Sequence, residues 1–371
     1  MRTSAAGQDS RRWGARVLAL GALAAVIIAF LLIVTGSGGG SSGNTHSLAA
    51  AAQTGHTNPK HPNKSRPAKP KFFRVGRFTI TLSEPSSAGI ANGKTSSGAP
   101  ARELITSIRY PALGTPNGRE NQRATPASSN GPFPLVIFSQ GYDSNDSAYA
   151  WLMDEWTSAG YVVAAPTYPF TAPTSTTGVN ESDIVNHPAD LRFVITSLLA
   201  GSGPSAQVRR LIDPGKVAVI GHSDGGDVSL AVVANSCCRV SSVKAAVILS
   251  GAELARFGGS YFSAASVPLL AVQGSADTIN PPGCSAQLYD QAPQPKYYLD
   301  VHDATHITPY IEPGTDRTTV GKATTAFLDR YLKGQQSALQ TLKRSANVPG
   351  ATTLFTSNAV PGVSPTCPGA P

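Results

Sequence analysis

The sequence predicts an α/β domain with a mostly parallel central sheet and helices on both faces, preceded by one N-terminal transmembrane helix. Between residues 72 and 346, short apolar β-branched runs alternate with segments of helical spacing. The runs are apolar throughout, as in strands that are buried on both faces. Residues 17–35 form an uncharged apolar stretch long enough to cross a bilayer.

The composition supports one large folded domain. Of the 371 residues, 41% are hydrophobic and only 14% are charged, which excludes a disordered or collagen-like chain. Low charge together with 36 Gly and 29 Pro suggests an exported protein. The net charge of +8 is uneven, because residues 1–59 contribute +3 and residues 60–77 contribute +7, which leaves −2 for the rest. This distribution argues against a basic nucleic-acid-binding domain.

The segment before the domain divides into three parts. Residues 1–16 carry four arginines and one aspartate, and no basic residue follows the apolar stretch until Lys60. This asymmetry predicts residues 1–16 in the cytoplasm and the later residues outside. The length of the stretch 17–35 favours a membrane anchor, while the small residues Val34–Ser37 keep a removed secretion signal open as the alternative. Residues 36–71, Gly/Ser-rich and then Pro/Lys-rich, predict a flexible spacer.

The domain itself, residues 72–346, is expected to open with an antiparallel hairpin and to continue with alternating strands and helices. A tail rich in Pro, Gly, Ser and Thr, residues 347–371, is expected to follow it. The hairpin is expected at 78–82 and 104–110, the strands at 134–138, 161–165, 216–220, 243–249, 267–273 and 296–301, and the helices at 148–159, 189–200, 223–235 and 318–331.

Ser223 lies in a G-x-S-x-G motif between a predicted strand and a predicted helix. The spacer contains a second match, residues 39–43, but no strand precedes it and no helix follows it. Only Ser223 has the context of a nucleophile elbow, in which the serine occupies a sharp turn at the carboxyl end of a strand. The residue is therefore our candidate nucleophile.

A serine nucleophile needs a base and an orienting acid, which follow it in the order acid and then histidine. Asp277 follows the predicted strand 267–273, and His306 follows the strand 296–301. The carboxyl ends of parallel strands share one edge of the sheet, where ligands bind. We therefore predict Asp277 as the acid and His306 as the base, with His302 as the alternative base. Other polar residues in this part of the chain are given structural roles. His222 is interpreted as a residue that packs or hydrogen-bonds beneath the turn, His187 as a helix-entry residue, and Asp300 and Asp303 as loop-capping groups.

Two backbone N–H groups are candidates for an oxyanion hole. The first belongs to Asp224, the residue after the nucleophile. The second belongs to Tyr142, because Gly141 allows close approach of the loop that follows the strand 134–138. The alternative for this loop is an ordinary glycine turn.

The four cysteines are too few and too irregularly spaced for a zinc ribbon or a disulfide scaffold. Because a bond between the adjacent residues Cys237 and Cys238 would be strained, we expect bridges from that pair to Cys284 and Cys367. The alternative is that all four are small buried residues.

From about Val75 to Lys333 the chain resembles the α/β-hydrolases, and among them the bacterial group of platelet-activating-factor acetylhydrolases, chlorophyllases and cutinase-like polyesterases. The resemblance implies a Ser/Asp/His carboxyl-ester hydrolase without a cofactor, and the sequence itself contains no pattern of metal ligands. Two positions depart from the pattern: Gln140 stands where the group commonly has His, and Asp224 where it often has an apolar or basic residue. The resemblance rests on residues 107–112 (SIRYPA), 134–142 (PLVIFSQGY), 160–166 (GYVVAAP), 187–191 (HPADL) and 221–226 (GHSDGG), with the loops of Asp277 and His306.

These observations predict a serine esterase outside the cytoplasm, either anchored in the cell membrane or secreted. Its partners would be a small or lipid-like ester and, through residues 17–35, the membrane. Two alternatives stay open: a thioesterase or peptidase on the same triad, and a catalytically silent binding module, which Asp224, Gln140 and the basic spacer would suit.

Overall fold

The computed structural model describes residues 72–85, 90–91, 94–95, 101–264, 266–356 and 359–368. The chain divides into two units, Met1–Ser65 and Arg66–Pro371, and all described residues belong to the second. The predicted cytoplasmic segment 1–16, the span 17–35 and the spacer up to residue 71 lie outside the described residues. Within the described part of the chain, no helix combines the length and the apolar character that a membrane crossing requires.

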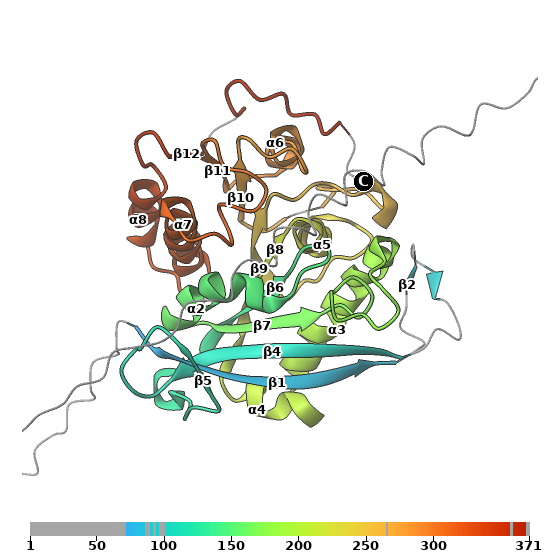
Figure 1. Ribbon diagram of the computed structural model, residues 1–371, viewed down its shortest axis with the longest axis vertical. Helices are drawn as coiled ribbons and strands as arrows, with labels where there is room; N and C mark the ends of the chain where they lie inside the picture. Colours follow the sequence, from blue (N-terminus) through green and yellow to red (C-terminus); the bar gives the residue numbers. More distant parts are fainter. Residues whose placement is uncertain are drawn as a thin grey trace, which may run out of the picture. The chain divides into compact units, whose positions relative to one another are not determined.

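The fold is α/β, as the sequence predicts. In the described residues ten strands form one sheet, in the order β12-β11-β10-β9-β8-β6-β7-β4-β1-β5, and β2 (Ile90–Ala91) and β3 (Lys94–Thr95) form a separate small ladder. The six strands from β7 to β11 along this order are mutually parallel (Figure 1). The strands of the large sheet are β1 (Arg74–Glu84), β4 (Arg102–Ala112), β5 (Glu120–Gln122), β6 (Phe133–Ser139), β7 (Val162–Thr167), β8 (Ile212–His222), β9 (Val243–Leu249), β10 (Leu269–Gly274), β11 (Lys296–Val301) and β12 (Thr352–Phe355).

Helices cover both faces of this sheet and create two apolar layers. One layer packs α3 (His187–Ala200), α5 (Asp224–Ala234) and α6 (Pro282–Gln291) on the sheet, with the short α4 (Ala206–Arg209) beside α3. The other packs α2 (Ala150–Ser158), α7 (Thr315–Tyr331) and α8 (Ala338–Ser345). Alternate residues of the parallel strands enter opposite layers, as Val217 and Ala218 do in β8. This double burial explains why the central strands are apolar throughout.

The opening hairpin and the predicted alternation of strands and helices are confirmed. β1 and β4 pair antiparallel from Arg74 opposite Ala112 to Glu84 opposite Arg102. The structure adds elements that the sequence analysis did not anticipate, among them α6 and α8. It also differs in the expected tail, where Thr352–Phe355 forms β12 and pairs antiparallel with β11. A four-residue edge strand flanked by Gly and Pro has too little periodicity to stand out from a tail.

The expected disulfide pairing is wrong. Cys284 is bonded to Cys367, and Cys237 is bonded to Cys238. Cys284 lies in the first turn of α6, and the C-terminal segment runs over that turn, where the Cys367 N–H donates to Gln287 Oε1 at 2.8 Å. The path of the C-terminal segment brings Cys367 to α6, and Cys367 therefore bonds to Cys284. Cys237 and Cys238 are left to bond to each other.

The two disulfides differ in the length of chain that they close. The Cys284–Cys367 bond joins residues 83 apart, whereas the other joins neighbours. A cross-link that closes a long loop lowers the entropy of the unfolded chain.

We therefore expect the double variant Cys284→Ser/Cys367→Ser to lose about 2–4 kcal/mol of unfolding free energy in urea denaturation. The matched control Cys237→Ser/Cys238→Ser is expected to change by less than about 0.5 kcal/mol. Equal unfolding midpoints for the two double variants would contradict this account.

Candidate active site

Ser223 lies in the turn between β8 and α5, with a left-handed backbone of φ 56° and ψ −128°. Such a conformation is costly for a residue with a side chain and persists only where the surroundings enforce it. The Ser223 N–H donates to Leu249 O of β9 at 3.0 Å, and its carbonyl accepts from the N–H groups of Gly226 and Asp227 at 2.7 and 3.0 Å. Both sides of the turn are thereby attached, one to the sheet and one to the helix.

Glycines allow strand, helix and neighbouring loop to meet around this turn. A Cβ on Gly221 would collide with the backbone of Gly225, and a Cβ on Gly225 would collide with the Ser139 carbonyl at the end of β6. A Cβ on Gly141 would lie 3.0 Å from the Ser223 Cβ. The loop that carries the predicted oxyanion donor of Tyr142 therefore packs directly against the candidate nucleophile.

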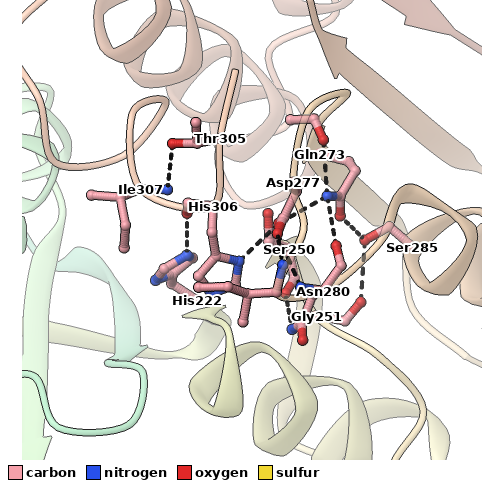
Figure 2. A network of polar contacts seen from close by, with 12 residues as sticks. His222, Ser250, Gly251, Gln273, Asp277, Asn280, Ser285, Thr305, His306 and Ile307 are labelled. Carbon is pink, nitrogen blue, oxygen red and sulfur yellow. Dashed lines mark hydrogen bonds and ion pairs between the residues drawn. The ribbon is translucent and has the colours of Figure 1, made fainter. Parts of the chain in front are cut away.

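Asp277 and His306 form a buried hydrogen-bonded pair (Figure 2). His306 Nδ1 lies 2.8 Å from Asp277 Oδ2, which also accepts from Gln273 Nε2 at 3.0 Å. The other carboxylate oxygen, Oδ1, accepts from the N–H groups of Ile279 and Asn280 at 2.9 and 3.0 Å. Because a carboxylate only accepts, His306 Nδ1 carries the proton and Nε2 of the neutral ring is left with its lone pair.

His222, which precedes Ser223, joins the serine turn to the His306 loop. Its Nε2 lies 2.9 Å from the His306 carbonyl oxygen, and its Nδ1 lies 2.7 Å from the Tyr149 hydroxyl. Since a carbonyl only accepts, Nε2 carries the proton and Nδ1 accepts from Tyr149. Burial, and then the neighbouring His306, lowers the pKa of His222 well below its ordinary value of 6.5. His222 is therefore a neutral structural link that holds His306 beside the serine turn.

A second set of polar groups surrounds Asp277 and was not foreseen from the sequence. Gln273 Oε1 accepts from Ser285 Oγ at 2.6 Å, and Asn280 Nδ2 donates to Ser250 O at 2.6 Å. Gln273 is fully buried near the carboxyl end of β10. A polar residue in an otherwise apolar strand is the one signal in the sequence that points to this role. Tyr149 gave no such signal.

The other predicted residues divide between the site and the periphery. Asp224 begins α5 directly after Ser223, and burial raises the pKa of its carboxyl group to about 7. The alternative base His302 instead contacts Thr353 of β12 through Nε2 at 3.0 Å, and His187 stacks on the Tyr168 ring. Among the described residues no group of three or more His, Cys, Asp or Glu side chains has the arrangement of a metal site.

Residues 116–351 match the model of the PET hydrolase-like family, which covers more than half of the chain. The chain belongs to the PET hydrolase-like family. It is 30% identical over 209 residues to a bis(hydroxyethyl) terephthalate hydrolase of Streptomyces coelicolor, which is 56% of this chain and 59% of the relative. Two cutinases, cutinase 1 of Thermobifida cellulosilytica and a cutinase of Thermobifida fusca, are each 29% identical to it over 206 residues. These matches cover 55% of this chain, 70% of the first cutinase and 61% of the second.

The tautomer of His222 in this PET hydrolase-like chain is open to direct measurement. We expect its ring to remain neutral with the proton on Nε2 at pH 5.5, about one unit below the ordinary histidine pKa, because burial opposes the charged form. Long-range ¹H–¹⁵N imidazole spectra distinguish the two neutral tautomers from the imidazolium ion, with His222→Gln assigning the signal. An imidazolium spectrum for His222 at that pH would contradict the assigned hydrogen bonds.

Proposed function

We propose that the protein is a serine hydrolase that cleaves carboxylic esters through an acyl-enzyme on the triad of Ser223, His306 and Asp277. The observation that carries the proposal is the buried 2.8 Å pair of His306 Nδ1 and Asp277 Oδ2, linked through His222 to the turn of Ser223. This pairing leaves the unprotonated His306 Nε2 to accept a proton, which is what a serine nucleophile requires.

The reaction proceeds in two halves. Ser223 Oγ attacks the ester carbonyl while His306 Nε2 takes the hydroxyl proton, and a tetrahedral intermediate forms. Its oxyanion accepts from the N–H groups of Tyr142 and Asp224. Collapse expels the alcohol, which takes the proton from His306, and leaves Ser223 acylated. A water molecule then repeats the sequence, giving its proton to His306 and releasing the carboxylic acid as Ser223 recovers its proton.

The substrates that we propose are uncharged carboxylic esters. The Streptomyces relative is named for hydrolysis of bis(hydroxyethyl) terephthalate, and the Thermobifida relatives are named cutinases. We propose the same chemical class for this chain, because the residues that would perform the chemistry lie within the matched segment 116–351.

We place this activity outside the cytoplasm. The Cys284–Cys367 disulfide supports the placement, because such bonds persist in oxidising compartments and are rare in the cytosol. Free thiols at both positions in protein isolated from its producing cells would contradict it.

Replacing the nucleophile tests the mechanism. Ser223→Ala removes the attacking oxygen, and we expect kcat for p-nitrophenyl esters to fall at least about 10⁴-fold while the unfolding midpoint is retained. The exposed Ser202→Ala is the matched control and is expected to remain within about twofold of wild type. Ester hydrolysis at the wild-type rate by folded Ser223→Ala would refute the assignment. A folded wild-type protein that cleaves no ester from acetate to palmitate would refute the proposed activity.

Replacing the acid tests the triad separately. Asp277→Asn keeps the size of the side chain but presents an amide to His306, so that the ring loses the partner that fixes its tautomer. We expect kcat to fall about 10³–10⁴-fold with a smaller change in KM. The matched control Asp300→Asn, at a carboxyl group on β11, is expected to change kcat by less than about threefold. The reverse order of these two effects would identify Asp300 as the acid.

A further inference from the structure

Asp224 places a carboxyl group at the backbone N–H that the proposed mechanism uses. The carboxyl group of Asp224 lies against the N–H of its own residue, which is one of the two oxyanion donors. Its Oδ2 is buried and has no hydrogen-bond partner among the described residues. A buried carboxylate oxygen without a partner is costly, whereas a neutral carboxyl group has a proton to offer. This carboxyl therefore has an unused hydrogen-bonding position beside the oxyanion hole.

The ionisable groups that face Asp224 come from three elements. Glu181 begins the short 3-10 helix Glu181–Asn186 and opposes ionisation of Asp224, and Asp227 lies one turn further along α5. Arg256, an exposed residue of the short helix Ala255–Phe257, is the cation that acts in the other direction. Burial is the main cause that raises the pKa of the Tyr142 and Tyr149 hydroxyl groups, and the nearby Asp224 raises both further.

The segment that carries Glu181 is held in place. Asn180 caps it by accepting from the Ser182 N–H at 3.1 Å. Asp183 accepts from Arg102 of β4 through both carboxylate oxygens, at 2.9 and 2.7 Å. The negative charge near Asp224 is therefore a built feature of the fold. Burial, with Glu181 as the next cause, raises the pKa of the Asp224 carboxyl group to about 7.

We propose that Asp224 is a catalytic residue, whose neutral carboxyl group donates its O–H to the oxyanion as a third donor beside the N–H groups of Tyr142 and Asp224. The inference rests on the proposed ester hydrolysis. No proton is transferred in this step, because the O–H donates a hydrogen bond that strengthens as charge develops on the substrate oxygen. Once ionised, the carboxylate binds its own N–H more strongly and repels the oxyanion, so hydrolysis declines.

The sign of the pH dependence follows from this role. His306 must be neutral to act as the base, so activity first rises with pH. Asp224 must be protonated, and because the pKa of its carboxyl group is raised to about 7, activity falls as the pH rises through that value. An esterase that needs only a neutral histidine keeps its activity on the alkaline side.

The test is the pH profile of kcat/KM for p-nitrophenyl butyrate, followed at the wavelength where p-nitrophenol and its anion absorb equally. Above about pH 7 we expect the wild-type value to fall about tenfold per pH unit, as one ionisation requires. Asp224→Asn carries a neutral donor at every pH and is expected to lose this decline, exceeding wild type at pH 9 by about tenfold or more. Asp224→Leu is expected to lose the decline as well, but with a kcat about 10–100-fold lower, because it cannot donate.

Two further variants identify the ionising group. Glu181→Gln removes a neighbouring negative charge, and the decline is expected to begin at lower pH. Asp227→Asn replaces the buried acid one turn further along α5, which accepts from the Ala252 N–H at 2.6 Å, and is expected to retain the decline. Identical alkaline profiles for wild type and Asp224→Asn, or a decline abolished by Asp227→Asn alone, would overturn the inference. Absence of any Ser223-dependent hydrolysis would instead refute the proposed function.

Discussion

The turn between β8 and α5 is the constraint on which the candidate site depends. It holds Ser223 in a left-handed backbone conformation that is unfavourable for a residue with a side chain. The close approach of β6, β8 and α5 enforces that conformation, and it is possible only because Gly221 and Gly225 carry no Cβ. The same approach brings the Gly141 loop against Ser223. One packing arrangement therefore determines the position of Ser223, the position of the Gly141 loop and the start of α5.

The polar groups on the two sides of Ser223 differ in whether they have hydrogen-bond partners. On the histidine side, both Asp277 oxygens accept two hydrogen bonds each, and His222 uses both ring nitrogens. On the oxyanion side, Asp224 Oδ2 and both polar atoms of the Gln140 side chain are buried without a partner in the described part of the chain. Folded proteins satisfy most buried polar groups, so a cluster of exceptions beside a nucleophile points to function.

The sequence predicts the strands, the opening hairpin and the pair of Asp277 and His306 for one physical reason. Strands buried on both faces are apolar throughout, and a parallel sheet brings their carboxyl ends to one edge. Gln273, Ser285 and Tyr149 could not be placed in this way, because their roles depend on contacts between distant segments. The pairing of Cys284 with Cys367 depends on the path of the C-terminal segment over α6, which no local pattern encodes. Asp224 stands out both in the sequence, as an unusual residue after the nucleophile, and in the structure, as an acid whose Oδ2 is buried without a partner among the described residues.

Covalent labelling with a p-nitrophenyl alkylphosphonate tests whether Ser223 is an activated nucleophile. We expect the intact mass of the folded protein to increase by one phosphonyl group, peptide mapping to place the group on Ser223, and Ser223→Ala to remain unlabelled. A folded wild-type protein that stays unlabelled, or one that is labelled at another residue, would contradict this role of Ser223.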